Sequence, residues 1–316
     1  MLRRVAALLL AVTAVGFSAS SASGGAYPGR NGVVAFARED FTTGLQIHIW
    51  TVDPVTLEET QLTNVPNALD QQPKYSPDGT RIAFSRDLGN QGAIYVMGAD
   101  GSSPTALTAD DGNTCPTWSP DGTKLAYSNG PGNIVIIDVA TKAVLDTLTS
   151  VQTCELSWSP LGDLIAFDAP TGISVIAPVS GATPTPVTND PTDSAPTWSP
   201  DGIRIAFSRG QAGSGHIVSV RADGADEIDV TTGDDDVTPG WSPDGALVAF
   251  TRADFDDVSG RLLKVAAGGG TPSALTAPAD GEADFQPDWQ PLAAPPPPPP
   301  PPPPAPPVPV APTFTG

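Results

Sequence analysis

Residues 196–207 read PTWSPDGIRIAF, and this stretch recurs along the chain. Related copies begin at Pro73, Pro116 and Pro239, and a degenerate copy, LSWSPLGDLIAF, runs over residues 156–167. The aromatic marker of the motif falls at Tyr75, Trp118, Trp158, Trp198, Trp241 and Trp289, in steps of 43, 40, 40, 43 and 48 residues. A period in this range predicts a propeller or a solenoid rather than an ordinary globular domain.

Each copy reads as a β-hairpin. The aromatic residue ends one short strand, Pro-Asp-Gly supplies the turn, and Ile-Ala-Phe begins the returning strand. A third β-rich run follows, such as residues 93–97, and a fourth short piece ends in Leu-Thr or Val-Thr. Four short strands in every 40–50 residues are typical of one propeller blade.

The repeat resembles the WD-like repeat of the TolB-type β-propeller, P-x-W-S-P-D-G-x-x-I-A-F. The resemblance covers residues 27–291 and implies an all-β propeller fold with a protein or peptide ligand at the mouth of its channel. The periplasmic TolB protein has an α/β domain before its propeller, whereas here the first repeat begins soon after the leader. We therefore expect the propeller without that domain.

The two ends of the repeat array complement each other. Residues 31–36, NGVVAF, match the second strand of a blade, with no first strand before them. Residues 286–291, QPDWQP, match a first strand with no second strand after them. The sequence predicts six blades, with the strand at 285–290 closing the ring against the strand at 33–38 and so removing open sheet edges. Five blades with unpaired ends are the alternative.

Residues 1–23 and 292–316 differ in composition from the repeats. The first segment has Arg3 and Arg4, then a 13-residue apolar run and small residues, as in a secretory signal peptide; the run is too short to span a membrane. The last segment contains ten consecutive prolines, Pro295 to Pro304, and predicts a proline-rich disordered tail. We expect an exported protein, periplasmic or extracellular, with no transmembrane segment. The tail is either a spacer, a ligand for a proline-binding module, or an end without a partner.

Acidic residues dominate the chain, with 35 Asp and Glu against 15 Lys and Arg and a formal net charge of −20. This charge disfavours nucleic acid as a partner. Loops that a propeller brings to one rim hold 19 of the carboxylates, but the opposite rim has nearly as many, and solvated loop charge is the alternative to a binding role. The candidate binding residues on this upper rim are Glu39, Asp40, Asp234, Asp235, Asp254, Asp256 and Asp257.

A sharper pattern pairs a position five residues before the aromatic marker with a position two residues after the Ile-Ala-Phe aromatic. In four repeats these positions hold Asp and Arg, and in the other two they hold Asn113 with Asn129 and Thr153 with Ala169. Because both lie at equal distances from the turn, a hairpin brings them face to face. We predict structural cross-strand pairs, namely Asp70 with Arg86, Asp193 with Arg209, Asp236 with Arg252, and Asp284 with Arg38.

The two cysteines fall in the two repeats that lack the Asp–Arg pair. Cys115 lies three residues before Trp118, and Cys154 lies four before Trp158. Side chains alternate faces along a strand, so the two cysteines point in opposite directions, as neighbouring blades need in order to meet. Export permits oxidation, and we predict a Cys115–Cys154 disulfide. Two reduced buried thiols are the alternative.

Catalytic motifs are sparse. The two histidines, His48 and His216, both fall in third strands, and no nucleophile elbow of the G-x-S-x-G type occurs. No metal site is predicted, although the residues 234–236 and 254–257 are candidates for a Ca²⁺ ligand set without EF-hand spacing. We therefore expect a monomeric, non-enzymatic scaffold without a cofactor that binds a protein or peptide, and the acidic rim favours a basic partner. The alternatives are a small molecule, sugar or cation in the central channel, or a propeller lyase or hydrolase.

Overall fold

The computed structural model describes residues 27–42, 45–89, 92–109, 112–130, 132–149, 155–211, 213–233, 235–254 and 259–293. The predicted signal peptide at 1–23 and almost all of the proline-rich tail lie outside these residues. The described chain is all-β, as the repeat predicts, and contains no helix that could span a membrane.

Three successive repeats form separate four-stranded antiparallel sheets. The first contains β8 (Thr114–Trp118), β9 (Lys124–Ser128), β10 (Ile134–Asp138) and β11 (Val144–Leu148). The second contains β12 (Leu156–Trp158), β13 (Ile165–Ala169), β14 (Gly172–Ile176) and β15 (Thr185–Pro186). The third contains β16 (Ser194–Trp198), β17 (Arg204–Arg209), β18 (His216–Arg221) and β19 (Ile228–Asp229).

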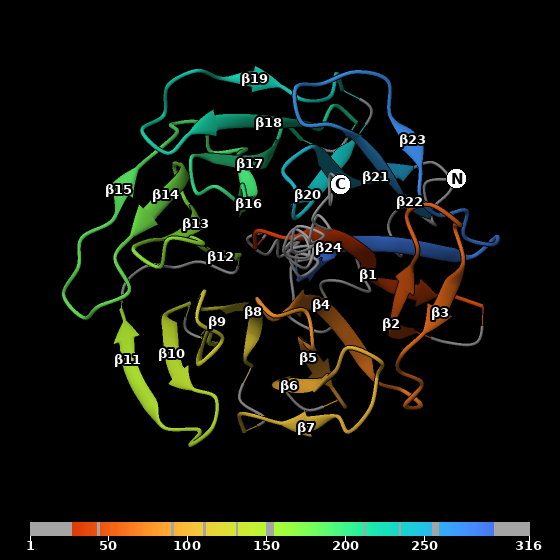
Figure 1. Ribbon diagram of the computed structural model, residues 1–316, viewed down its shortest axis with the longest axis horizontal. Helices are drawn as coiled ribbons and strands as arrows, with labels where there is room; N and C mark the ends of the chain where they lie inside the picture. The colour runs from red at the N-terminus through yellow and green to blue at the C-terminus, as the bar shows by residue number, and fades with distance from the viewer. Residues whose placement is uncertain are drawn as a thin grey trace, which may run out of the picture.

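The remaining strands form one twelve-stranded sheet that joins both ends of the described chain. Its N-terminal part contains β1 (Arg30–Asp40), β2 (Gln46–Val52), β3 (Glu59–Gln61), β4 (Leu69–Tyr75), β5 (Arg81–Asp87), β6 (Ala93–Gly98) and β7 (Thr105–Ala106). Its C-terminal part contains β20 (Asp236–Trp241), β21 (Leu247–Asp254), β22 (Ser259–Ala266), β23 (Ser273–Ala274) and β24 (Glu282–Leu292). Figure 1 shows the sheets around a common centre, with β4, β8, β12, β16, β20 and β24 nearest to it.

Strand β24 pairs antiparallel with β1, from Arg30 opposite Leu292 to Asp40 opposite Glu282. Both strands are longer than the predicted segments at 33–38 and 285–290. The single bridges to neighbouring strands, Ile47 with Leu69 and Gly260 with Ala283, are parallel and mark the places where one four-strand unit meets the next. The last strand of the described chain is therefore hydrogen-bonded to the first.

The hydrophobic core is divided among the boundaries between neighbouring units. One cluster joins Trp158 and Phe167 to Ile134 of the preceding sheet, and another joins Trp241 and Phe250 to Ile217. The remaining clusters repeat this arrangement at the other boundaries, including the boundary between the four-strand unit that contains β1 and the unit that contains β21. Each of the six clusters buries at least two aromatic side chains, and burial of this apolar area stabilises the packing of one unit on the next.

The Ser-Pro-Asp-Gly turns lie at one end of the sheets, which we call the lower rim. In the repeat at residues 76–81, Asp78 Oδ1 accepts hydrogen bonds from Ser76 Oγ at 2.5 Å and from the Thr80 backbone N–H at 3.1 Å. Gly79 at the next position has a φ of 68°, a conformation that glycine adopts without steric cost. The opposite end, where β1 and β21 end and where β4, β16, β20 and β24 begin, is the upper rim.

Candidate functional site

The structure places four of the seven predicted binding carboxylates on the upper rim. Glu39 and Asp40 end β1, Asp254 ends β21, and Asp235 directly precedes β20. Asp234, Asp256 and Asp257 lie outside the described residues, so the structure does not test the alternative of a Ca²⁺ ligand set at this rim. Asp235 Oδ1 accepts the backbone N–H groups of Gly213 and Gly215, and Asp40 Oδ1 accepts that of Thr42, so both carboxylates also order loops of this rim.

Glu39 differs from the other rim carboxylates in its surroundings. It lies between Ala283 on β24 and Ile47 on β2, two apolar residues of the adjacent strands. Burial raises the pKa of the Glu39 carboxyl to about 7. Desolvation penalises the charged form of an acid, and no charged group of the described chain offsets that penalty here. Within the described part of the chain, Glu39 is thus a half-buried rim carboxylate with no counterion.

This pKa predicts a pH-dependent stability. The folded-state pKa is raised above the unfolded value, so Glu39 costs free energy when ionised above about pH 7, and this cost disappears as the pH falls toward 4.5. Glu39→Gln should therefore stabilise the protein at pH 8 by on the order of 1–3 kcal/mol, allowing for partial solvation, and change little at pH 5. Urea unfolding at both pH values measures this, with the exposed Glu58→Gln as control. An equal gain at both pH values would show that burial of the charge is not the cause.

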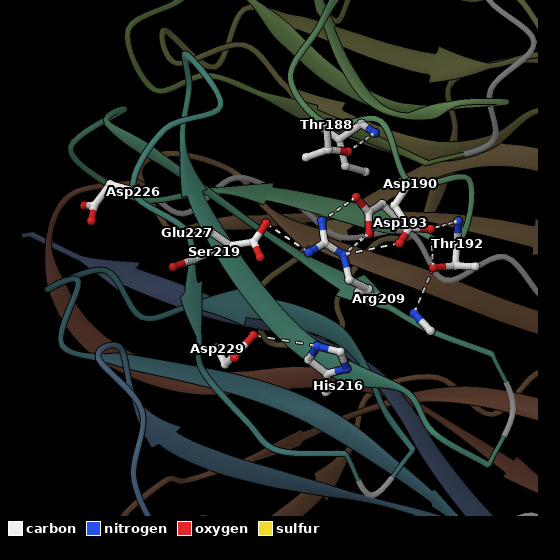
Figure 2. A network of polar contacts seen from close by, with 12 residues as sticks. Thr188, Asp190, Thr192, Asp193, Arg209, His216, Ser219, Asp226, Glu227 and Asp229 are labelled. Atoms are coloured by element: carbon white, nitrogen blue, oxygen red, sulfur yellow. Dashed lines mark hydrogen bonds and ion pairs between the residues drawn. The ribbon is translucent and has the colours of Figure 1, made fainter.

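The structure brings together all four predicted Asp–Arg pairs. In each pair two guanidinium nitrogens donate to the two carboxylate oxygens at 2.6–2.9 Å, and the Asp side chain is fully buried. Figure 2 shows the pair on β17, where Arg209 also contacts Glu227 at 2.9 Å and Asp190 at 3.9 Å. Burial raises the pKa of Asp284, and the bidentate bond from Arg38 opposes that shift. These pairs hold the hairpins together and leave little carboxylate chemistry accessible.

The register that aligns these pairs depends on a bulge that the sequence pattern did not predict. Next to the turn, Tyr75 lies opposite Ile82. If this register continued along the hairpin, Asp70 would not lie opposite Arg86, as it does. A β-bulge between Gln71 and Lys74 restores the alignment, with Gln72 at a φ of 59°. The same position three residues before the aromatic has positive φ in four other repeats: Cys115, Ala195, Thr238 and Gln286.

Side chains of neighbouring units satisfy the backbone at these bulges. Gln286 Oε1 accepts the Gln72 backbone N–H at 2.9 Å, and Gln72 Oε1 in turn accepts the Cys115 N–H at 2.8 Å. Glu155 accepts the Ala195 N–H in the same way. These bonds connect the strands nearest to the centre of the molecule.

The two repeats without an Asp–Arg pair differ from the rest in this region. Asn113 donates to Thr108 Oγ1 at 3.2 Å and to the Ala109 carbonyl at 3.0 Å, while Asn129 Oδ1 accepts the Asn133 N–H. In the other repeat Thr153 lies outside the described residues. Cys115 is buried and accepts a hydrogen bond from Gln72 Nε2 at 3.1 Å. Cys154 lies outside the described residues, and the Cys115–Cys154 disulfide stays a prediction.

A buried pair of charged residues near the centre of the molecule was not predicted from the sequence. Lys74 on β4 and Asp288 on β24 are both buried, and Lys74 Nζ lies 3.8 Å from Asp288 Oδ1. Burial raises the pKa of Asp288 to about 6, against the effect of Lys74, and burial lowers the pKa of Lys74. Asp288 Oδ2 also accepts the Tyr75 backbone N–H at 2.7 Å. This group links the last strand to the second unit of the sheet.

The histidines occupy the third strands of their repeats, as the sequence predicts. Burial lowers the pKa of His48, and His216 Nε2 lies 3.7 Å from Asp229 Oδ1 (Figure 2). Neither is placed beside a nucleophile in the described residues. Both lie on interior strands of their sheets, near the upper rim.

An all-β chain whose short antiparallel sheets surround a centre belongs to the propeller class of proteins. Its residues 28–183 match the family model of the TolB beta propeller domain. The match confirms the resemblance carried by the repeat motif: residues 28–183 are similar to the TolB beta propeller domain, and the chain is consistent with a TolB-like propeller.

Solved structures support the fold at low sequence identity. TolB from Acinetobacter baumannii is 19% identical with a TM-score of 0.69, over 82% of this chain and 67% of that chain. The hydrazine synthase of Kuenenia stuttgartiensis is 15% identical with a TM-score of 0.64, over 84% of this chain and 47% of that chain. The β-propeller domain of the Trilobed protease from Pyrococcus furiosus is 14% identical with a TM-score of 0.54, over 84% and 98%. This chain thus spans about half of the hydrazine synthase chain and about two thirds of the TolB chain.

Proposed function

We propose that this protein is an exported, non-enzymatic propeller scaffold whose upper rim binds a basic protein or peptide. The observation that carries the proposal is the half-buried Glu39 carboxylate, whose pKa burial raises to about 7 and which has no counterion among the described residues. A lysine or arginine side chain of a partner would supply the missing charge, and the apolar flank of Ile47 and Ala283 would strengthen the contact by lowering the local dielectric.

The neighbouring rim carboxylates support the same class of partner. Asp40 and Asp254 lie at ends of β1 and β21, and Glu282 lies directly opposite Asp40 on β24. Carboxylates at one rim attract cations over a Debye length and raise the rate of association more than the affinity. The similarity to TolB supports a protein or peptide as the ligand of a propeller rim.

We further propose that the propeller has six blades and is closed by β24. The pairing of β24 with β1 supports closure, because it puts the first and last strands into one blade with β2 and β3. The hydrophobic clusters also support it, since one lies at each boundary between successive four-strand units. The Trilobed protease propeller is described as having an open velcro topology, so closure is a property that differs among similar folds.

The binding proposal predicts the behaviour of a charge-neutralised rim. The triple variant Glu39→Gln, Asp40→Asn and Asp254→Asn should bind a basic partner about tenfold more weakly at low salt, with a shallower dependence of Kd on salt. Retention from a native cell-envelope extract identifies the partner by mass spectrometry, and titration of the purified partner from 20 to 500 mM salt measures the effect.

The matched control removes the same charge from the lower rim with Glu58→Gln, Asp163→Asn and Asp223→Asn. This control should bind as the parent does. If both triple variants lose affinity equally, net charge rather than the upper rim is responsible. If no protein is retained while a sugar or a divalent cation raises the melting temperature, the site binds a small ligand and the proposal is wrong.

A further inference from the structure

One lower-rim turn departs from the repeat at an exposed position. In the repeat at residues 199–204, Asp201 Oδ1 accepts Ser199 Oγ–H at 2.6 Å and the Ile203 N–H at 3.0 Å. The degenerate copy has Leu161 at the position of this aspartate. Its side chain is 66% exposed, and its backbone N–H donates instead to Ser159 Oγ at 3.2 Å.

Leucine at this position cannot make the carboxylate hydrogen bonds of the other turns, and it exposes apolar surface to solvent. A change that breaks a local rule without an internal gain is typical of a functional site. Ile203, on the next turn, is a second departure: it is 46% exposed and stands where Thr80 and Thr123 each donate a side-chain hydrogen bond to the turn aspartate.

The two departures lie together. A Cβ atom built on Gly202 would come within 2.7 Å of Leu161 Cγ, so the leucine rests against the turn that carries Ile203. Gly202 also has a φ of 70°, which disfavours any larger residue there. Leu161 on one turn and Gly202 with Ile203 on the next are together called the lower-rim apolar surface.

We propose that this lower-rim apolar surface binds the chain's own C-terminal segment, residues 305–316 (APPVPVAPTFTG). The described chain leaves the sheet at the same rim: Gln290 Nε2 donates to the carbonyl of Gly79 in a lower-rim turn, and Arg30 Nε donates to the Ala293 carbonyl. The segment that follows thus starts on the face that carries Leu161.

The chemistry of that segment fits an apolar surface on this acidic chain better than a second copy does. Residues 294–316 contain no charged residue, and Val308, Val310 and Phe314 supply apolar side chains. Two copies of a chain with a formal net charge of −20 repel each other. In polyproline II geometry the ten prolines before the segment extend about 31 Å, which exceeds the radius of roughly 24 Å expected for a globule of this size.

The contact needs little intrinsic affinity. A tethered segment has an effective concentration in the millimolar range, so a weak apolar contact is populated within one chain. A proline-rich sequence also loses little conformational entropy on docking, because the proline ring restricts φ before binding.

Hydrogen exchange of the two turns tests the proposal. In the full chain the amides of residues 159–163 and 199–204 should exchange at least fivefold more slowly than in a chain ending at Ala293, and a synthetic peptide of residues 303–316 added at millimolar concentration should restore the protection. In the double variant Leu161→Asp and Ile203→Thr, the full chain and the chain that ends at Ala293 should show the same amide exchange rates. Equal exchange with and without the tail would overturn the proposal.

Two further measurements separate the remaining outcomes. Leu161→Asp restores the turn hydrogen bonds, so its melting temperature should stay the same or rise by about 2 °C, and loss of protection in this variant cannot come from unfolding. Val55→Asp changes a side chain that is 86% exposed on another lower-rim turn and should leave the protection intact. Protection that rises with protein concentration would identify a second copy as the occupant and contradict the intramolecular contact.

Discussion

A chain that ends at Ala279, and so lacks β24, should lose cooperative folding and aggregate. Its β1 would lose the partner that pairs with it from Arg30 to Asp40. Arg38 would lose the Asp284 carboxylate, and the core cluster with Phe36 and Val34 would lose Trp289. Removal of one buried Trp alone costs about 3–5 kcal/mol, and an unpaired strand edge promotes association with other chains.

Thermal unfolding and size-exclusion chromatography measure this result. The control is a chain that ends at Ala293, which keeps β24 and should melt within about 3 °C of the parent. The chain that ends at Ala279 distinguishes a propeller closed by β24 from an open one. If that chain is monomeric and melts close to the parent, β24 does not close the propeller and the proposed architecture is wrong.

Asp70→Ala should destabilise the protein by about 3–5 kcal/mol, because it leaves the Arg86 guanidinium buried without its carboxylate. Arg86 is 5% exposed, and it lies over the rings of Phe84 and Tyr95 at 5.1 and 5.0 Å, so it cannot reach water without losing these contacts. The corresponding loss for Asp236→Ala should be smaller, since the Arg252 side chain is 21% exposed.

The chain itself suggests the compensating change. Asn113 and Asn129 occupy the equivalent positions of the next repeat. The double variant Asp70→Asn and Arg86→Asn removes both charges and should recover at least half of the loss caused by Asp70→Ala. Urea unfolding measures all three proteins. A double variant as unstable as the single one would indicate that the cost comes from packing around the arginine rather than from its uncompensated charge.

The repeat motif predicts the strand order, the turns and the Asp–Arg partners, because these features depend on spacing within one hairpin. The period of the aromatic marker fixes how often a unit recurs, and Asp70 with Arg86 follows from their distances to one turn. The rim positions of Glu39 and Asp254 follow in the same way from their places after a second strand.

Features that depend on two distant segments were not predictable in this way. The bulge at Gln72 carries no sequence signal, since the equivalent residues are Cys115, Ala195, Thr238 and Gln286, none of which favours positive φ. Lys74 and Asp288 meet only because β24 pairs with β1 in the first unit and so lies beside β4 of the second unit. Their signal was a charge directly before the aromatic marker, where other repeats have Thr117, Ser157, Thr197 or Gly240. Glu39 was predictable in position, but its pKa depends on the residues of adjacent strands.

The pairing of β1 with β24 has a consequence for the timing of folding. The hydrogen bond between Arg38 and Asp284 joins residues 246 positions apart. At a synthesis rate of 5–20 residues per second, the ribosome needs about 12–50 s to reach β24 after it has completed β1. During that interval one edge of β1 has no partner from its own chain. The pairing of β1 with β24 therefore forms only after β24 has been synthesised. Any step that delays β24 prolongs the stage in which the edge of β1 is open to aggregation.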